Sequence, residues 1–148
     1  KFKELTGVDI EFVQDNEAFS NRGVLRGLHF QKGKYAQAKL VRVVKGKVLD
    51  VVVDLRASSI TYGQSFSCVL SEENKKQLFV PKGFAHGYAV LEDNTVFVYK
   101  CDNFYYPASE GGILYSDQSL NIDWMLSEDE IMLSEKDKTL KPLKEIQL

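Results

Sequence analysis

Short β-rich segments that follow one another with brief polar connections are the dominant feature of this chain. Alternating or continuous apolar runs cover 8–14, 23–31, 39–44, 47–56, 64–70, 76–81, 87–92 and 95–101. The connections, such as "RASSITYG", "SEENK" and "EDN", are short and rich in turn residues. No long helical period interrupts them. Many short strands with brief links predict an all-β sandwich or barrel.

The length of 148 residues suits one domain with a sizeable core. No repeat or linker divides the chain, so we expect a single domain over residues 1–148. After Cys101 the sequence carries aromatic residues, Gly and Asp but no sustained period. We predict a long ordered C-terminal loop region there, because aromatic content argues against disorder.

Charge and hydropathy exclude several classes of partner. The net charge of −2 gives no basic excess for neutralising phosphates, so we expect no nucleic-acid partner. No apolar run approaches the ~18 residues of a membrane helix, and we expect no membrane partner. The opening "KFKELTGVD" is too polar for a signal peptide. Cys68 and Cys101 lack CxxC spacing and are predicted to be buried free thiols of a cytoplasmic protein.

Polar residues interrupt two of the predicted strands. "GVLRGLHFQ" (23–31) places Arg26 and His29 among apolar residues, and "VPKGFAHGYAV" (80–90) contains His86. These are the only two histidines of the chain. The inward positions of a small barrel surround a common cavity, so we expect the two histidines to converge on one site.

A metal site is the first alternative for such histidines. "PKGFAH" matches the second half of a metal-binding cupin signature, but the first half, HxHxxxxE, is missing. Two histidines and a carboxylate could form a facial triad, whereas zinc and similar ions usually take three or four protein ligands. We therefore expect no metal, and the lack of GxGxxG gives no sign of a nicotinamide cofactor.

Acid–base chemistry fits these residues better. A histidine can remove a proton at neutral pH, and a carboxylate can orient it and stabilise its charged form. The candidate carboxylates lie in "SEKD" (134–137), with Asp117 and Asp123 as rivals. Tyr99 places a phenol at the end of one strand and Lys39 opens another.

Six segments together resemble the dTDP-4-dehydrorhamnose 3,5-epimerase family. They are "QDNEAFSNRGVLRGLHFQ", "QAKLVRVVKGKVLDVVVDLR", "FVPKGFAHGYAVL", "YKCDNFYYP", "IDW" and "LSEKD", and they cover nearly the whole chain from about Phe12 onward. The resemblance implies a cupin-type β-sandwich or jelly-roll barrel and a homodimer. It also implies metal-free, cofactor-independent epimerisation of dTDP-4-keto-6-deoxy-D-glucose at C3 and C5, in dTDP-L-rhamnose biosynthesis.

The same resemblance implies a role for each site residue. His29 matches the general base, Asp137 its carboxylate partner, Tyr99 the general acid and Lys39 the group that stabilises the enolate oxygen. Arg26 matches a diphosphate contact. Gln14, Asn16, His86, Tyr105 and Lys136 match the remaining substrate-binding positions.

Two features depart from the pattern of the family. Family members carry a further N-terminal stretch with a DxRGxF-type motif, which has no counterpart here, so we expect an upstream segment to be missing from this form. An arginine often seen in the family is replaced in Glu110-Gly111-Gly112. The alternatives within the fold are a 3-epimerase, a 5-epimerase or a 3,4-ketoisomerase. Further alternatives are a non-catalytic sugar-binding cupin and a metal-dependent cupin oxygenase.

Overall fold

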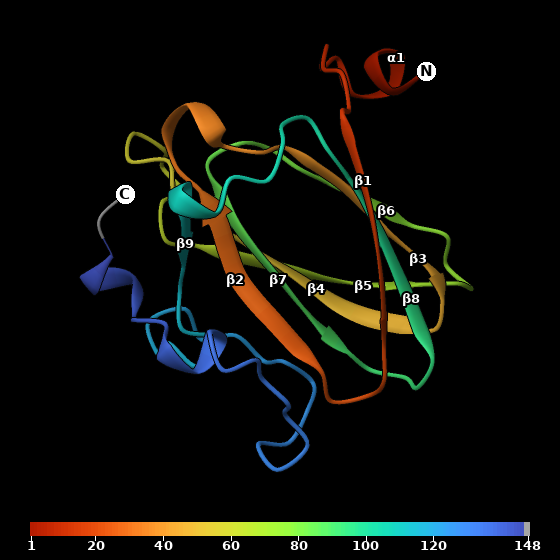
Figure 1. Ribbon diagram of the computed structural model, residues 1–148, viewed down its shortest axis with the longest axis vertical. Coiled ribbons are helices and arrows are strands. Elements are labelled where there is room, and N and C mark those ends of the chain that lie inside the picture. Colours follow the sequence, from red (N-terminus) through yellow and green to blue (C-terminus); the bar gives the residue numbers. More distant parts are fainter. Residues whose placement is uncertain (147–148) are drawn as a thin grey trace.

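The computed structural model describes residues 1–146. Their strands form two antiparallel β-sheets that pack face to face (Figure 1). The first sheet has the order β1 (Gln14–Ser20), β8 (Thr95–Cys101), β3 (Lys39–Lys45) and β6 (Gln77–Val80). The second has the order β5 (Ser65–Ser71), β4 (Lys47–Asp54), β7 (Phe84–Val90), β2 (Leu25–Gln31) and β9 (Glu110–Gly112). This β-sandwich confirms the all-β class predicted from the sequence.

The helical elements are short. Helix α1 (Phe2–Thr6) precedes the first strand, and its Phe2 ring packs edge-on against Phe12 and Phe79. The 3₁₀-helices are η1 (Gly33–Tyr35), η2 (Pro107–Ser109), η3 (Asp137–Thr139) and η4 (Leu143–Glu145). No helix in the described chain is long and apolar enough to cross a membrane.

An apolar cluster joins the two sheets. Val41 and Phe97 of the first sheet pack with Val48 and Tyr88 of the second, and all four are buried. Side chains alternate along a strand, so the face of β4 that carries Val48 also directs Asp50 into the space between the sheets. The space between the sheets is therefore apolar around Val48 and polar around Asp50.

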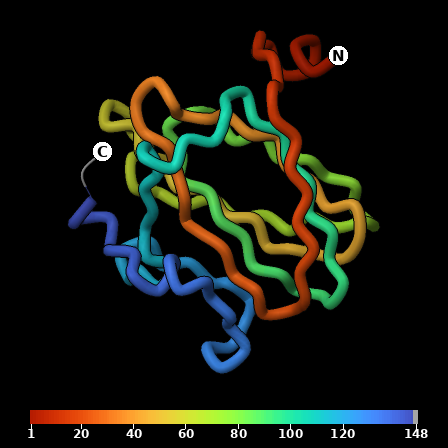
Figure 2. The backbone as a smooth tube through the Cα atoms, in the orientation of Figure 1, coloured from red at the N-terminus to blue at the C-terminus, as the bar shows by residue number. Residues whose placement is uncertain are grey.

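The outer face of the five-stranded sheet is covered by the C-terminal part of the chain. Leu49, Val51 and Val53 of β4 pack there with Ile113 and Trp124, among others. Because β4 is covered on both faces, its apolar run is nearly continuous. Figure 2 shows residues beyond 113 (blue) running beside β2 and β9, and this course brings η3 to β2.

The predicted strands agree with the observed ones to within two residues, except at β7, which begins at Phe84 instead of 87, and at the N-terminus. The strand expected over 8–14 is wrong, because only Gln14 of that segment lies in a strand and β1 continues to Ser20. The apolar alternation there is real, but a strand needs a paired neighbour. β8 pairs with residues 14–20, and before them only the Val13 N–H bonds to its last residue, Cys101. The short β9 was not predicted.

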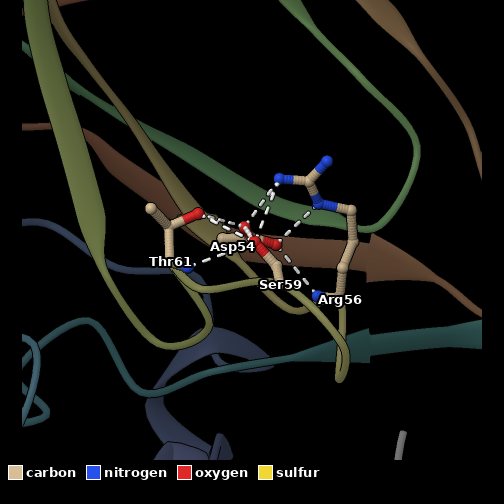
Figure 3. Close-up of polar contacts among 4 residues, drawn as sticks. All are labelled: Asp54, Arg56, Ser59 and Thr61. Carbon is tan, nitrogen blue, oxygen red and sulfur yellow. Dashed lines mark hydrogen bonds and ion pairs between the residues drawn. The ribbon is translucent and has the colours of Figure 1, made fainter.

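A buried carboxylate at the end of β4 has a structural role (Figure 3). Asp54 is 2% exposed and accepts hydrogen bonds from Arg56 (2.9 and 2.7 Å), Ser59 (2.6 Å) and Thr61 (2.6 Å). These donors, with the Arg56 guanidinium first, hold the pKa of Asp54 well below its usual range. The network fixes the loop between β4 and β5. Cys68 and Cys101 are free thiols, the first half-buried and the second buried.

Candidate active site

A cavity between the two sheets gathers most of the polar residues that the sequence analysis selected. It consists of two hollows of about 270 and 530 Å³. Both are lined by His29, Lys39, Tyr99, Tyr105 and Glu110, so they form one continuous site. His29 comes from β2 of one sheet, whereas Lys39 and Tyr99 come from β3 and β8 of the other. The site is therefore walled by both sheets.

His29 and Asp137 form a pair across 108 residues of sequence. His29 Nε2 lies 2.5 Å from Asp137 Oδ1, and the Gly27 N–H donates to the other carboxylate oxygen at 3.3 Å. Burial raises the pKa of Asp137, but the hydrogen bond and charge of His29 and the Gly27 N–H outweigh it, so the pKa lies below its usual range. Whenever the imidazole carries a single proton, an ionised Asp137 holds that proton on Nε2. That leaves Nδ1 with a free lone pair, as a general base requires.

An irregularity in β2 explains why Arg26 and His29, three residues apart, both line the cavity. Residues three apart on a regular strand point to opposite faces. Here the register with β7 shifts between Arg26 and His29. Gly27 lies in this stretch at φ 111°, and a Cβ on it would come within 2.6 Å of the Gly87 Cα, so only glycine fits. The bulge turns an arginine and a histidine to the same site.

Tyr99 and Lys39 form the opposite wall. Burial raises the pKa of the Tyr99 phenol, which keeps the phenol in its acid form at neutral pH. Burial lowers the pKa of Lys39, against the opposing effect of Cys101, Asp50 and Glu110. Lys39 Nζ lies 6.0 Å from the centroid of the Tyr99 ring. Among the described residues no carboxylate lies within ion-pair distance of Lys39, and its side chain lines both hollows of the cavity.

A second histidine–carboxylate pair lies deeper in the cavity. His86 of β7 is buried, and its Nε2 lies 3.0 and 2.9 Å from the two carboxylate oxygens of Asp50. Asp50 of β4 is fully buried. The sequence analysis missed Asp50, although "VLDVVVD" contains a charged residue within an apolar strand, the same signal that selected Arg26 and His29.

Amide and aromatic side chains line the cavity near its mouth. Gln14 and Asn16 of β1 are joined by a hydrogen bond of 2.9 Å, and Gln14 Oε1 accepts the Tyr105 N–H at 3.0 Å. The Tyr105 hydroxyl donates to Glu110 at 2.6 Å. Lys136 forms an ion pair of 2.5 Å with Glu110 but does not itself line the cavity. Glu110, which the sequence analysis noted only for its neighbouring glycines, is thus part of the site.

The rival carboxylates have other partners. Asp117 accepts hydrogen bonds from Ser119 and from the Leu143 N–H, and Asp123 accepts the Met125 N–H. Neither contacts a histidine. Within residues 1–146 no group of three or more His, Cys, Asp or Glu side chains is placed to hold a metal ion.

Comparisons with known proteins identify close relatives. A family model described as dTDP-4-dehydrorhamnose 3,5-epimerase matches residues 1–145. The dTDP-4-dehydrorhamnose 3,5-epimerase of Shigella flexneri is 54% identical over 136 residues, which cover 92% of this chain and 74% of that protein.

Solved structures agree with this match. The crystal structure of a dTDP-4-dehydrorhamnose 3,5-epimerase from Elizabethkingia anophelis is 55% identical with a TM-score of 0.93, and the match covers 97% of this chain and 78% of that chain. A dTDP-6-deoxy-D-glucose-3,5-epimerase from Legionella pneumophila, in complex with dTDP-4-keto-L-rhamnose, is 49% identical with a TM-score of 0.94. That match covers 99% of this chain and 77% of the other.

Proposed function

Because the chain belongs to the dTDP-4-dehydrorhamnose 3,5-epimerase family, we propose that the cavity binds dTDP-4-keto-6-deoxy-D-glucose and inverts C3 and C5 of its sugar. The protein is an isomerase of the epimerase class, with the cupin-type β-sandwich of its relatives. The family, the enzyme class and the activity predicted from the sequence are confirmed.

The reaction requires a base and an acid on opposite faces of the sugar. The C4 ketone makes the hydrogens on C3 and C5 acidic, and loss of either hydrogen gives an enolate. Return of a proton to the other face inverts the carbon. The observation that carries the proposal is that His29 and Tyr99 line one cavity from opposite sheets. His29, paired with ionised Asp137, removes the proton, and the neutral Tyr99 phenol delivers the other.

The enolate oxygen needs positive charge or donors in a site with little water. Lys39 places an amine on the cavity as a donor, and no carboxylate of the described chain lies within ion-pair distance of it. The His86–Asp50 pair lies on the same cavity, and Asp50 keeps a proton on the His86 Nε2. We assign the C4 oxygen to Lys39, and we assign to His86 a contact with the sugar through Nδ1, the ring nitrogen that Asp50 does not occupy.

The nucleotide half of the substrate fits the remaining lining. Arg26 offers a planar set of donors to the diphosphate oxygens. Gln14 and Asn16 present amide groups, and Tyr105 presents a ring that is 53% exposed at the cavity mouth. Lys136 acts through its ion pair with Glu110.

Solvent exchange tests the function directly. Incubation with dTDP-4-keto-6-deoxy-D-glucose in deuterated water is expected to place deuterium at both C3 and C5, because both hydrogens are removed and replaced from solvent-equilibrated groups. NMR of the sugar distinguishes the alternatives. A 5-epimerase labels only C5, a 3-epimerase labels only C3, and a ketoisomerase moves the carbonyl to C3. Absence of label at both carbons would contradict the proposal.

We also propose that the protein is a homodimer. Two features support this: β1 is an edge strand of its sheet, and its Phe19 side chain is 63% exposed beside the cavity. Light scattering is expected to give twice the mass of one chain, and a monomeric mass at micromolar concentration would contradict the proposal. The cytoplasmic location and the single domain expected from the sequence stay predictions.

A further inference from the structure

Gln31, the last residue of β2, is buried at the cavity wall with its amide group fully engaged. Its Nε2 donates to the Tyr35 carbonyl at 2.7 Å and to the Phe104 carbonyl at 3.2 Å. Its Oε1 accepts the Tyr106 N–H at 2.7 Å. The side chain is only 8% exposed. Both N–H groups of the Gln31 amide are therefore occupied by main-chain carbonyls. No donor of this side chain remains for a ligand.

Two loops meet at this glutamine. We call them the η1 loop (32–38) and the aromatic loop (102–106). The Tyr35 and Tyr106 rings stack with their centroids 4.0 Å apart. Gln37 donates to the Asn103 carbonyl at 2.8 Å, and Asn103 donates to the Lys34 carbonyl at 3.0 Å. The ring stack and these hydrogen bonds join the two loops. Of the amides of Gln31, Gln37 and Asn103, only that of Gln31 bonds both the residue before Tyr105 and the residue after it.

Tyr105 depends on such support. Its ring is half-exposed, so packing alone does not fix it. Its main-chain N–H bonds to Gln14, and its hydroxyl bonds to Glu110. Gln31 holds the carbonyl of the residue before it and the N–H of the residue after it. Gln31 therefore fixes the main chain on both sides of Tyr105, while Glu110 holds the hydroxyl of its ring.

We propose that Gln31 is a positioning residue that fixes the Tyr105 ring against the base of the nucleotide. This inference rests on the proposed function, because it assigns the nucleotide half of a dTDP-sugar to Tyr105. Gln31 then contributes to nucleotide binding without contacting the nucleotide. Its loss weakens substrate binding and leaves the proton transfers at His29 and Tyr99 nearly intact.

The test measures dTDP binding by calorimetry and turnover of the full substrate. Gln31→Leu keeps the volume and removes the amide. It is expected to weaken dTDP binding about 10-fold, the scale of one base–aromatic contact, and to raise KM similarly while kcat falls less than about 3-fold. Gln77→Leu, an exposed glutamine on β6, is the matched control and is expected to behave as the wild type.

A double-mutant cycle shows whether Gln31 acts through Tyr105. Tyr105→Ala alone is expected to weaken dTDP binding by about the same factor, and adding Gln31→Leu to it is expected to cost little more. Losses that multiply would overturn the proposal, because they would mean that Gln31 acts independently of the ring. Unchanged dTDP binding by Gln31→Leu would also overturn it.

A pH series keeps the inference testable if Gln31→Leu folds poorly. In Gln31→Glu the ionised carboxylate has no hydrogen to donate to the Phe104 or Tyr35 carbonyl, whereas its protonated form has one. Burial favours protonation, so dTDP binding relative to the wild type is expected to improve as the pH falls from about 8 to about 5. A ratio that stays flat would overturn the inference. Wild-type protein that neither binds dTDP nor exchanges deuterium would overturn the proposed function itself.

Discussion

Replacing His29 with asparagine is expected to lower solvent exchange at C3 and C5 by about 10³-fold or more. A single base on one face of the sugar serves both carbons, so its loss stops both exchanges together. General bases contribute roughly 10²–10⁴-fold, and of the two histidines of the second sheet, each paired with a carboxylate, only His29 lines both hollows of the cavity. Asparagine keeps a polar side chain beside Asp137, so the variant is expected to bind dTDP as the wild type does.

Asp137→Asn tests the role of the carboxylate that pairs with His29. The carboxylate orients the imidazole and stabilises its charge but does not touch the substrate, so its loss is expected to cost less than the loss of His29. The exchange rates at C3 and C5, measured by NMR on both variants, show which of the two substitutions causes the larger loss. Near-normal turnover by His29→Asn would show that another group is the base. A larger loss in Asp137→Asn than in His29→Asn would contradict the assigned roles.

Tyr99→Phe is expected to separate proton removal from inversion. The change deletes one hydroxyl and keeps a ring that packs against Phe97 at 5.8 Å between centroids. His29 lies on the other sheet and still removes protons, so deuterium continues to enter the substrate. Inversion requires a donor on the opposite face and is expected to fall about 10²-fold or more. The variant then returns protons to the face they left.

The rate of solvent exchange and the rate of inversion are both measured on one NMR sample, so they are compared under identical conditions. Because burial raises the pKa of Tyr99, the wild-type phenol stays protonated through neutral pH, and the ratio of exchange to inversion is expected to be constant between about pH 6 and pH 8. Equal losses of exchange and inversion in Tyr99→Phe would mean that the hydroxyl only positions the sugar. A water would then be the acid.

Part of this site could be predicted from the chain without its fold. A charged or titratable residue within an apolar strand is costly to bury without a partner, so Arg26, His29 and His86 stood out in the sequence. The same rule applied to Asp50 would have found the partner of His86. Strand positions followed from short apolar runs and turn residues, because these are local properties of the chain.

Other parts depended on contacts that no local pattern encodes. The segment 8–13 alternates as a strand does, yet β8 pairs with 14–20 instead. No local pattern separates Asp137 from Asp117 and Asp123: the family resemblance implied Asp137, and the path of the C-terminal segment over the second sheet brings it to His29. Arg26 and His29 share a cavity because the β2–β7 register shifts between them, and the spacing of three residues alone indicates opposite faces.

The sequence by itself determined the β class, the strands and the residue types capable of acid–base chemistry, since those depend on propensity, periodicity and the cost of buried charge. The tertiary structure alone decided which of these residues meet. His29 and Asp137 are 108 positions apart, and His29 and Tyr99 lie on different sheets. Such distances are set by how two sheets pack and where a bulge turns a side chain, and each depends on the whole chain at once.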